Sequence, residues 1–386
     1  MALTIIIVKF VFLVSTVYSK VTLENSGFES QPTNLTTNST SQFVLLNSKT
    51  NVIPGWSFNG TVWYVTAGGN ISLPGNGHGL QLGPNGVINQ TFKTDGSYYY
   101  TLTFTLAPSS MNCASNFTAV NVSGSDESKV FIYKESFGSE MWQTYAYSMS
   151  REIQRGIMGI QFQSVAGSND CWPIIDTLLV NGIGSPRLYG DNGFMNSGFE
   201  VGPAFLDNSS QGILLDDDTN EEAFKVVQQW TILGMIKYID SKHYAVPRGR
   251  GAVMLVSGNP SGILYNRRFS RHGKITLDFI MGDANDSCVG DFTVYLQVGN
   301  YMMWNFTMRS LGVGSRVRHS VTFKAEFSKT ESVPISFSSF NVTRTSDQQV
   351  LCGPVIDSTV IRFSSSKILH YEPVIFCFVL ATVFLI

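Results

Sequence analysis

A five-residue motif, Asn-Ser-Gly-Phe-Glu, occurs twice in the chain, at Asn25–Glu29 and again at Asn196–Glu200. Similar signals follow each copy in the same order, and each copy closes on an Ile-Asp pair. The first asparagines of the two motifs are 171 residues apart (25 to 196), and the closing aspartates, Asp176 and Asp357, are 181 apart. A slowly growing offset indicates insertions in loops, and a period this long is typical of a duplicated domain rather than a solenoid. The sequence therefore predicts two tandem copies of one domain.

The length and charge of the chain limit the classes of partner. In a chain of 386 residues, each copy has about 160–170 residues, enough to bury a core of its own. Charged residues make up only 14 %, and the net charge is −2. No basic field would attract nucleic acid or an anionic membrane surface, so neither is expected as a partner. The surface must be made polar by asparagine, serine, threonine, glycine and attached sugar.

Short stretches of alternating apolar and polar residues run through both copies. Examples are Tyr98–Leu106 and Val321–Phe327. Such alternation in β-branched and aromatic residues, bounded by Gly, Asn and Pro, predicts half-buried antiparallel strands. The best candidate for an amphipathic helix, 220–229, is short. The sequence therefore predicts two all-β sandwiches, with the recurring Trp56 and Trp230 in their cores.

The N-terminal end of the chain predicts a processing signal. Residues 1–19 indicate a secretory signal peptide, because an apolar run interrupted by Lys9 precedes a permissive cleavage site after Ser19. A buried strand is the alternative.

The C-terminal end also predicts processing. Val374–Ile386 is apolar but shorter than the roughly 20 residues of a membrane span. With the serines and short spacer before it, this run predicts a glycosylphosphatidylinositol-anchor signal over 364–386, with attachment at Ser364 or Ser365. A short tail anchor is the alternative. No lysine or arginine follows the apolar run, which argues against a stop-transfer segment.

Four of the five cysteines occupy corresponding places in the two copies, and the fifth, Cys377, lies in the apolar tail. Four cysteines allow three pairings. The duplication favours one bridge per domain, Cys113–Cys171 and Cys288–Cys352. Zinc binding is a poor alternative, because the chain has no Cys-x-x-Cys and no nearby pair of histidines.

Asn-x-Ser/Thr sequons are frequent, and with a signal peptide they predict a surface that carries several N-glycans. The asparagines are Asn34, Asn38, Asn59, Asn70, Asn89, Asn116, Asn121, Asn208, Asn285, Asn305 and Asn341. Asn89 and Asn305 lie in strand-like stretches, so we expect these two asparagines to be the least readily glycosylated.

These signals divide the chain into a first domain over 20–181, a linker over 182–195 and a second domain over 196–363. Because the linker is short, the two domains are expected to touch and to act as one unit. The segment 213–219 resembles an inserted loop. Its three successive aspartates are expected to be a solvated charge run rather than a calcium site.

Common catalytic motifs are missing from the sequence. It contains no Gly-x-Ser-x-Gly, no His-Glu-x-x-His and no glycine-rich phosphate loop. The duplication preserves none of the five histidines. The protein is therefore expected not to be an enzyme, although carboxylates far apart in sequence would still suffice for a hydrolase.

Two pairs of carboxylates recur with the duplication. Asp176 and Asp357 are expected to hydrogen-bond neighbouring backbone, with contact to a ligand as the alternative. Glu29 and Glu200 follow Gly-Phe near the start of a strand, where a carboxylate caps a turn or helps to hold a structural cation. We favour the structural role for both pairs and assign no metal and no cofactor.

Aromatic residues are the candidates for a ligand site, because sugar rings stack their C–H faces on aromatic faces. Tyr64 and Tyr238 recur, and both an outward-facing sugar contact and a place in the core suit them. Trp63 and Trp142 have no clear aromatic counterpart in the second copy. That difference favours a surface role in the first copy only.

Taken in order, several motifs resemble one known family. They are Asn25–Glu29, Ile53–Trp56, Leu73–Gly83, Tyr100–Phe104 and Cys352–Asp357. The resemblance is to the plant cell-wall family built on the domain of unknown function 642, and it covers the whole chain between the two processing signals. Cys171-Trp172-Pro173 departs from the usual Cys-Gly-Pro.

The resemblance implies a fold, a location and partners. It implies two galactose-binding-like jelly-roll domains and secretion to the cell wall, and only a branch of the family is anchored to the outer face of the plasma membrane. It also implies non-catalytic association with wall polysaccharide. Pectin methylesterase is the implied protein partner, and docking to that enzyme is the alternative function. The family supplies no catalytic residues.

Overall fold

The computed structural model describes residues 20–35, 41–124, 127–150, 156–165, 171–186, 193–207, 209–217, 225–256, 261–269, 273–328 and 330–363. The predicted signal peptide, the anchor signal with Ser364 and Ser365, and the sequon asparagines Asn38 and Asn208 lie outside these residues. Within the described ranges no helix has the length and hydrophobicity to cross a membrane.

The first half of the chain is a sandwich of two β-sheets. Its strands are β1 (Lys20–Val21), β2 (Phe43–Leu45), β3 (Ser57–Asn59), β4 (Val62–Thr66), β5 (His78–Leu82), β6 (Val87–Lys93), β7 (Tyr99–Ala107), β8 (Ala119–Gly124), β9 (Glu127–Ile132), β10 (Gln143–Ser150), β11 (Ile157–Ser164) and β12 (Ile174–Ile183). Short helical turns in its loops are η1 (Pro74–Asn76), α1 (Met111–Ala114) and η2 (Glu135–Phe137). The larger sheet has the order β2-β4-β5-β12-β7-β10, with β1 beside β12, and the smaller has the order β3-β6-β11-β8-β9.

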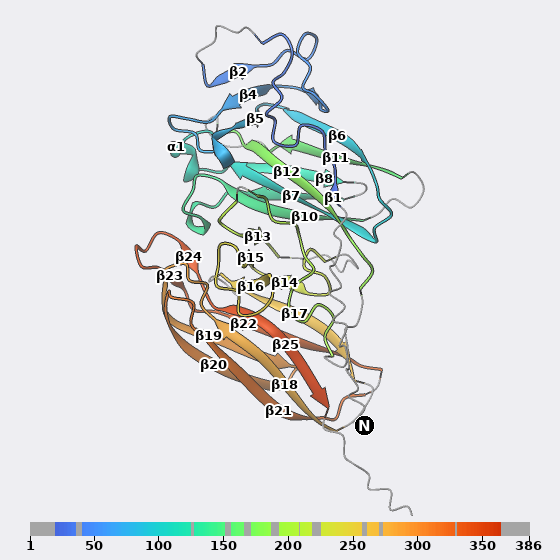
Figure 1. Ribbon diagram of the computed structural model, residues 1–386, viewed down its shortest axis with the longest axis vertical. Coiled ribbons are helices and arrows are strands. Elements are labelled where there is room, and N and C mark those ends of the chain that lie inside the picture. The colour runs from blue at the N-terminus through green and yellow to red at the C-terminus, as the bar shows by residue number, and fades with distance from the viewer. Residues whose placement is uncertain are drawn as a thin grey trace, which may run out of the picture.

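The second half repeats this plan (Figure 1). Its strands are β13 (Ile213–Leu215), β14 (Thr231–Leu233), β15 (Ile236–Asp240), β16 (Gly251–Leu255), β17 (Ser261–Arg268), β18 (Gly273–Gly282), β19 (Cys288–Val298), β20 (Met302–Leu311), β21 (Arg316–Ala325), β22 (Ser332–Ser339), β23 (Thr343–Thr345), β24 (Leu351–Cys352) and β25 (Val355–Phe363). One sheet has the order β13-β15-β16-β25-β18-β21, and the other has the order β14-β17-β22-β19-β23-β24 with β20 beside β19. Strand β13 therefore takes the place that β2 has in the first half.

Within each half the strands pair antiparallel, and their alternating apolar residues meet between the sheets. In β7, for example, Tyr100, Leu102 and Phe104 are completely buried in the core of the first half. Trp56 and Trp230 lie in the two cores, as expected. The predicted all-β fold of two sandwiches is confirmed.

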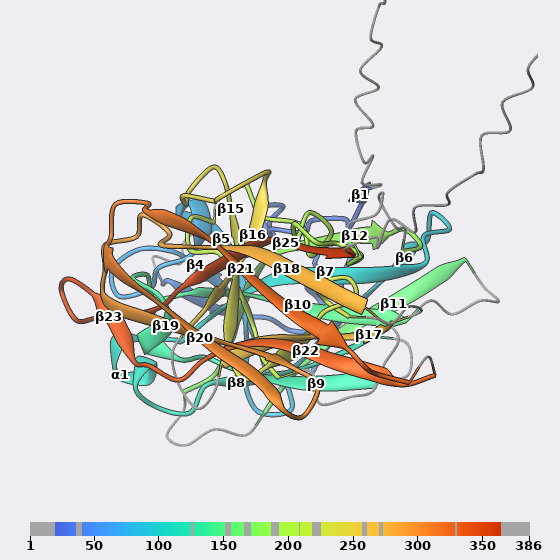
Figure 2. The same cartoon turned by 90° about the horizontal axis from the view of Figure 1, so that it is seen from below.

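The two halves are joined edge to edge. Strand β13 pairs in parallel with β10 of the first half, with Thr144 opposite Ile213 and Tyr145 opposite Leu214. The larger sheets thus form one 13-stranded sheet. In Figure 2 most of its strands lie along one side of the molecule, and most strands of the smaller sheets lie along the other. The cores also interlock, because Ala146 packs into the core of the second half and Leu214 into that of the first.

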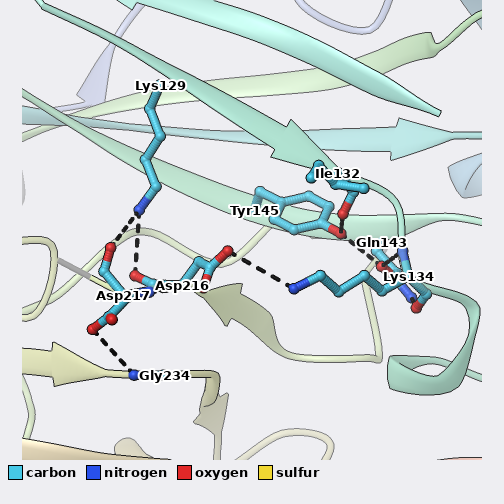
Figure 3. Close-up of polar contacts among 8 residues, drawn as sticks. All are labelled: Lys129, Ile132, Lys134, Gln143, Tyr145, Asp216, Asp217 and Gly234. Carbon is cyan, nitrogen blue, oxygen red and sulfur yellow. Dashed lines mark hydrogen bonds and ion pairs between the residues drawn. The ribbon is translucent and has the colours of Figure 1, made fainter. Parts of the chain in front are cut away.

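Polar contacts to the acidic run reinforce this join (Figure 3). Lys129 Nζ donates to the carbonyl oxygens of Asp216 at 3.3 Å and Asp217 at 3.1 Å. Lys134 Nζ lies 3.9 Å from the Asp216 carboxylate, and Asp217 Oδ1 accepts from the Gly234 N–H at 3.1 Å. The expectation of a loop was wrong for Ile213–Leu215, which form β13, whereas Asp216 is half-buried and Asp217 is exposed. Strand β13 lies between β10 and β15, and the backbone that follows it accepts hydrogen bonds from Lys129 of the first half.

Both predicted disulfides are confirmed. Cys113 bonds to Cys171 with Cα atoms 5.3 Å apart, and Cys288 bonds to Cys352 with Cα atoms 5.9 Å apart. Disulfides of this kind persist in oxidising compartments and fit an extracellular protein.

The repeated motif forms the same turn in each half. The Asn25 amide brackets the backbone of Ser30, donating to its carbonyl at 3.0 Å and accepting from its N–H at 2.9 Å. Asn196 brackets Val201 in the same way, at 2.7 Å and 2.9 Å. Because one short amide side chain satisfies two backbone groups, the motif fixes the chain as it enters each sandwich.

Candidate functional site

A pocket of about 380 Å³ lies where the two halves meet. The first half contributes Leu179 and Asn181 from β12. The second half contributes the segment Pro203–Asp207, the end of β15 and the loop that follows it. This volume is in the range of sites for small ligands, and apolar side chains with a few polar groups line it, which is typical of such sites.

A stacked pair of aromatic rings lines the pocket. The ring of Phe205 lies parallel to that of Tyr238, with centroids 4.9 Å apart and planes 9° apart. Tyr238 is only 3 % exposed, and its hydroxyl donates to the Phe199 carbonyl at 2.7 Å. Phe205 is half-buried, so it is the ring that a ligand would meet.

An amide donor is held in the pocket wall. Asn181 is 2 % exposed, and its Oδ1 accepts from the Ala204 N–H at 3.1 Å and from the Thr101 hydroxyl. A backbone N–H can only donate, so the amide atom that faces Ala204 must be the oxygen. Asn181 Nδ2 is buried, and within the described part of the chain no acceptor reaches it. A buried donor without a partner is costly.

Charged groups of both signs surround the pocket. Arg250 Nε lies 3.7 Å from Glu200 Oε2, and Asp240 Oδ1 lies 2.9 Å from His243 Nδ1. Lys242 is exposed in the same loop. Such a rim offers hydrogen-bond donors and acceptors to a polar, uncharged or weakly charged ligand.

The four aromatic residues predicted to bind ligand are not brought together. Tyr64 is 3 % exposed and donates to the Phe28 carbonyl at 3.0 Å, as Tyr238 does in the second half. Neither tyrosine therefore faces outward, and Tyr238 meets the pocket only beneath Phe205. Trp142 is 4 % exposed and lies with the half-buried Trp63 in a small apolar cluster on the first half. The surface role expected for the tryptophans has no support in this packing.

The recurring glutamates hold backbone in both halves. Glu29 Oε1 accepts from the His78 N–H at 2.8 Å, and Glu200 Oε1 accepts from the Arg250 N–H at 2.9 Å. Glu29 therefore ties the entry turn of the first half to the first residue of β5, and Glu200 ties that of the second half to the residue before β16. The expected capping role agrees with these contacts.

The recurring aspartates lie deep in each half. Asp176 accepts from the Thr177 N–H, and Asp357 accepts from the N–H groups of Ser358 and Arg248. Burial raises the pKa of Asp357 to about 7, although these backbone donors lower it. Burial also raises the pKa of Asp176 well above its usual value.

No metal-binding group of three or more His, Cys, Asp or Glu side chains occurs among the described residues. The pocket also lacks a nucleophile hydrogen-bonded to a base, the arrangement that covalent catalysis needs. What the pocket offers is stacking and hydrogen bonding.

Sequence reasoning missed Phe205, Asn181 and the loop with Lys242. The sequence puts Asn181 at the end of the first predicted domain and Phe205 near the start of the second. It therefore does not indicate that the two residues share one site. The available signal was the apolar stretch Val201–Phe205 directly after the second motif, which has no equivalent after the first.

The fold and the pocket define a tandem jelly-roll protein with a ligand-sized site at its junction. The chain belongs to the family described as protein of unknown function DUF642, whose sequence model matches residues 21–181 and 192–362. It is 32 % identical to the Arabidopsis thaliana protein DUF642 L-galactono-1,4-lactone-responsive gene 2, over 79 % of this chain and 82 % of that protein. The Arabidopsis protein TEEBE is 28 % identical over 81 % of this chain and 85 % of that protein.

Solved structures of carbohydrate-binding modules are also similar to the chain. The tandem CBM22 domain of Paenibacillus barcinonensis Xyn10C covers 80 % of this chain and 93 % of its own, with 9 % identity and a TM-score of 0.26. TmCBM61 in complex with β-1,4-galactotriose covers 42 % of this chain and 98 % of its own, with 16 % identity and a TM-score of 0.27. Scores this low carry no argument about the fold or ligand of this chain.

Proposed function

We propose that this protein is a secreted, non-catalytic protein of the plant cell wall and that its junction pocket binds part of a wall polysaccharide. The observation that supports this proposal is the pocket itself, where the half-buried Phe205 ring is combined with a rim of charged groups. A sugar ring needs this combination, an aromatic face for its C–H groups and polar groups for its hydroxyls.

Processing at the two ends completes the proposal. Removal of residues 1–19 would send the chain to the cell exterior, and a lipid anchor at Ser364 or Ser365 would hold it on the outer face of the plasma membrane. The pocket would then face the wall. Two disulfides suit that location.

The described sequon asparagines lie away from the strands that line the pocket. Nine sequon asparagines are described, and seven of them are exposed while Asn121 and Asn341 are half-buried. Asn89 and Asn305 do lie in strands, β6 and β20, but their side chains are exposed. None of the nine described asparagines lies in a strand of the 13-stranded sheet, three strands of which line the pocket. N-glycans at these nine positions would therefore leave those strands uncovered.

The test is binding of the secreted protein to insoluble cellulose, xylan and pectin, with Phe205→Ala beside the wild type. We expect saturable binding to at least one polymer, weakened about 5- to 10-fold by the substitution, since a stacking contact contributes about 1 kcal/mol. Tyr301→Ala is the control, because Tyr301 is 95 % exposed and far from the pocket in sequence and sheet. Circular dichroism checks that both variants are folded.

Two outcomes would contradict the proposal. Equal binding by the wild type and Phe205→Ala would remove the pocket as the site. Absence of binding to every polymer would remove the polysaccharide function, and docking to pectin methylesterase would then be tested by co-precipitation with that enzyme.

A further inference from the structure

Cationic side chains gather on the outer face of the second half, on the neighbouring strands β25, β18 and β21. Successive residues of a strand point to opposite faces, and Ile275 and Leu277 of β18 lie in the core, so the residues that alternate with them face outward. Five exposed cations occupy outward positions of the three strands. This set, the basic strip, consists of Lys274, Arg316, Arg318, Lys324 and Arg362.

The register of the strands aligns the basic strip. Lys274 lies directly opposite Lys324, and Arg318 and Arg316 follow on the same face of β21. Alternate residues of a strand are about 6.7 Å apart, so the row from Lys324 to Arg316 is about 27 Å long. Arg362 lies in the same face one strand further on, beside β18. The strip is therefore long and open, and it suits an extended ligand.

A buried carboxylate holds two of the guanidinium groups in place. Asp278 is 2 % exposed, and its Oδ2 accepts from Arg318 Nη2 at 3.3 Å and from Arg362 Nη2. The side chains of the two arginines are nonetheless 63 % and 58 % exposed. A guanidinium has five N–H donors, and this contact uses one of them in each arginine. Because the groups are already oriented, less side-chain freedom is lost when they bind a second partner.

The charges of the strip are only partly compensated. Lys274 and Lys324 face each other across antiparallel strands, where like charges destabilise a sheet. Glu326, just after β21, forms an ion pair with Lys324 and offsets part of this repulsion. The carboxylates within β18, β21 and β25 themselves are those of Asp278 and Asp357, and both are buried. The exposed face of these strands is therefore positive, although the whole chain has a net charge of −2.

The first half has no charge at the corresponding positions. Strands β7, β10 and β12 correspond to β18, β21 and β25, and the register gives as counterparts Tyr99, Trp142, Thr144, Ser150 and Asn181. The second half covers part of this face, since Thr144 Oγ1 lies 3.0 Å from Ser209 Oγ and Asn181 accepts from the Ala204 N–H. The fold thus forms without the cations, and only the second half presents an open, charged face.

From this arrangement we propose that the basic strip binds an acidic polysaccharide, a polyuronate chain whose carboxylates pair with the cations. Hydrogen bonds between guanidinium or ammonium groups and carboxylates are among the strongest that side chains form. Ser320 and Thr322 are exposed between the cations of β21 and can bond sugar hydroxyls.

An acidic protein fits the strip less well than a polyuronate. Protein interfaces have an apolar centre and are depleted in lysine, whereas the outward row from Arg316 to Lys324 contains no apolar side chain. No residue of the strip lines the junction pocket, so the inference does not depend on the function proposed for that pocket.

Binding of the secreted protein to soluble polygalacturonate tests the inference. We expect saturable binding that weakens at least tenfold between about 0.05 M and about 0.5 M NaCl, because salt screens exposed charges. Fully methyl-esterified polygalacturonate lacks the carboxylates, so it should bind roughly tenfold more weakly at the lower salt concentration.

The double variant Lys274→Gln/Lys324→Gln should bind polygalacturonate about fivefold more weakly at low salt. Its Tm should equal or exceed that of the wild type, because the substitutions remove a like-charge pair. The matched control is Lys49→Gln/Lys93→Gln, which makes the same change of charge at exposed lysines of the first half and should keep the wild-type affinity. Phe205→Ala should also keep it, which separates the strip from the junction pocket.

Three results would overturn the inference. The first is a wild type that does not bind polygalacturonate, or that binds the esterified polymer equally well. The second is a control double variant that loses as much affinity as the strip variant. The third is binding of polyglutamate, or of vesicles containing phosphatidylserine, as tightly as polygalacturonate at equal charge, which would make the strip a general polyanion surface or a membrane contact.

Discussion

One pair of corresponding positions carries aromatic side chains in the first half and cationic side chains in the second. On the first half, Trp63 and Trp142 pack with Val65, Ile71 and Leu73 in a small apolar cluster outside the main core. The register of the strands places Lys237 where the first half has Trp63, and Arg316 where it has Trp142. Lys237 is 5 % exposed, and Arg316 donates to the Pro247 carbonyl at 2.6 Å.

This difference shows which side chains can change after a domain is duplicated while its backbone stays the same. The entry turns, the tyrosine hydroxyl contacts and the closing aspartates keep their places because they satisfy backbone groups. In the first half the outer cluster satisfies no backbone group with its rings, so the second half can place the cations Lys237 and Arg316 at the corresponding positions. The first version contributes stability at every pH, whereas the second makes stability depend on the protonation of a buried lysine.

The largest expected effect on stability comes from the aromatic cluster of the first half. Trp142→Ala should lower the free energy of unfolding by about 3–5 kcal/mol, the usual range for a buried tryptophan. Arg316→Ala, at the equivalent position, should lower it by about 1 kcal/mol or less, the value of one hydrogen bond. Urea denaturation of both variants measures the difference, and equal losses would show that the two clusters are energetically alike.

The edge strands β2 and β13 give a second comparison. Leu45 and Leu214 correspond in register, but Leu45 is 60 % exposed and Leu214 is 2 % exposed, because β10 covers only the second. Leu214→Ala should cost about 2–4 kcal/mol and Leu45→Ala less than about 0.5 kcal/mol. A small effect at Leu214, measured by the urea midpoint, would mean that the interlocked cores contribute little.

A third effect, confined to alkaline pH, is the pH dependence that Lys237 introduces. Burial lowers the pKa of Lys237 to about 8, although the charge of Asp286 acts in the opposite direction. Between pH 8 and 10.5 the unfolded chain binds the proton that the folded chain has lost, so stability rises with pH in this window. Relative to Lys237→Met, the wild type should gain up to about 3 kcal/mol there. Parallel pH profiles of the two proteins would contradict this, and Lys242→Met, at an exposed lysine, should follow the wild type.

Most of the fold could be predicted from the sequence because local rules and the duplication agree. Period-two alternation predicted the strands, and the recurrence of four cysteines predicted both disulfides. The direction of Tyr64 and Tyr238 could not be predicted from their own segments. Each hydroxyl is directed inward by a carbonyl of the entry motif, 36 and 39 residues earlier.

The candidate site was harder to predict because it belongs to neither copy alone. Phe205 lies beside Asn181 because the N–H of its neighbour Ala204 donates to Asn181 Oδ1. Strand β13, which joins the two halves, has only three residues, too few to show a period-two alternation. The acidic residues after β13 also made this strand hard to predict, since a charge run is typical of exposed loops. Only the arrangement of the halves shows that these residues share a pocket.

Strand β13 also makes the two halves of the duplicated chain depend on each other. A first half made alone would keep the bare edge of β10, and a second half made alone would present Leu214 to water. Two such fragments in one solution would have complementary unsatisfied surfaces and would recognise each other. The two halves are thus complementary fragments that a peptide linker connects.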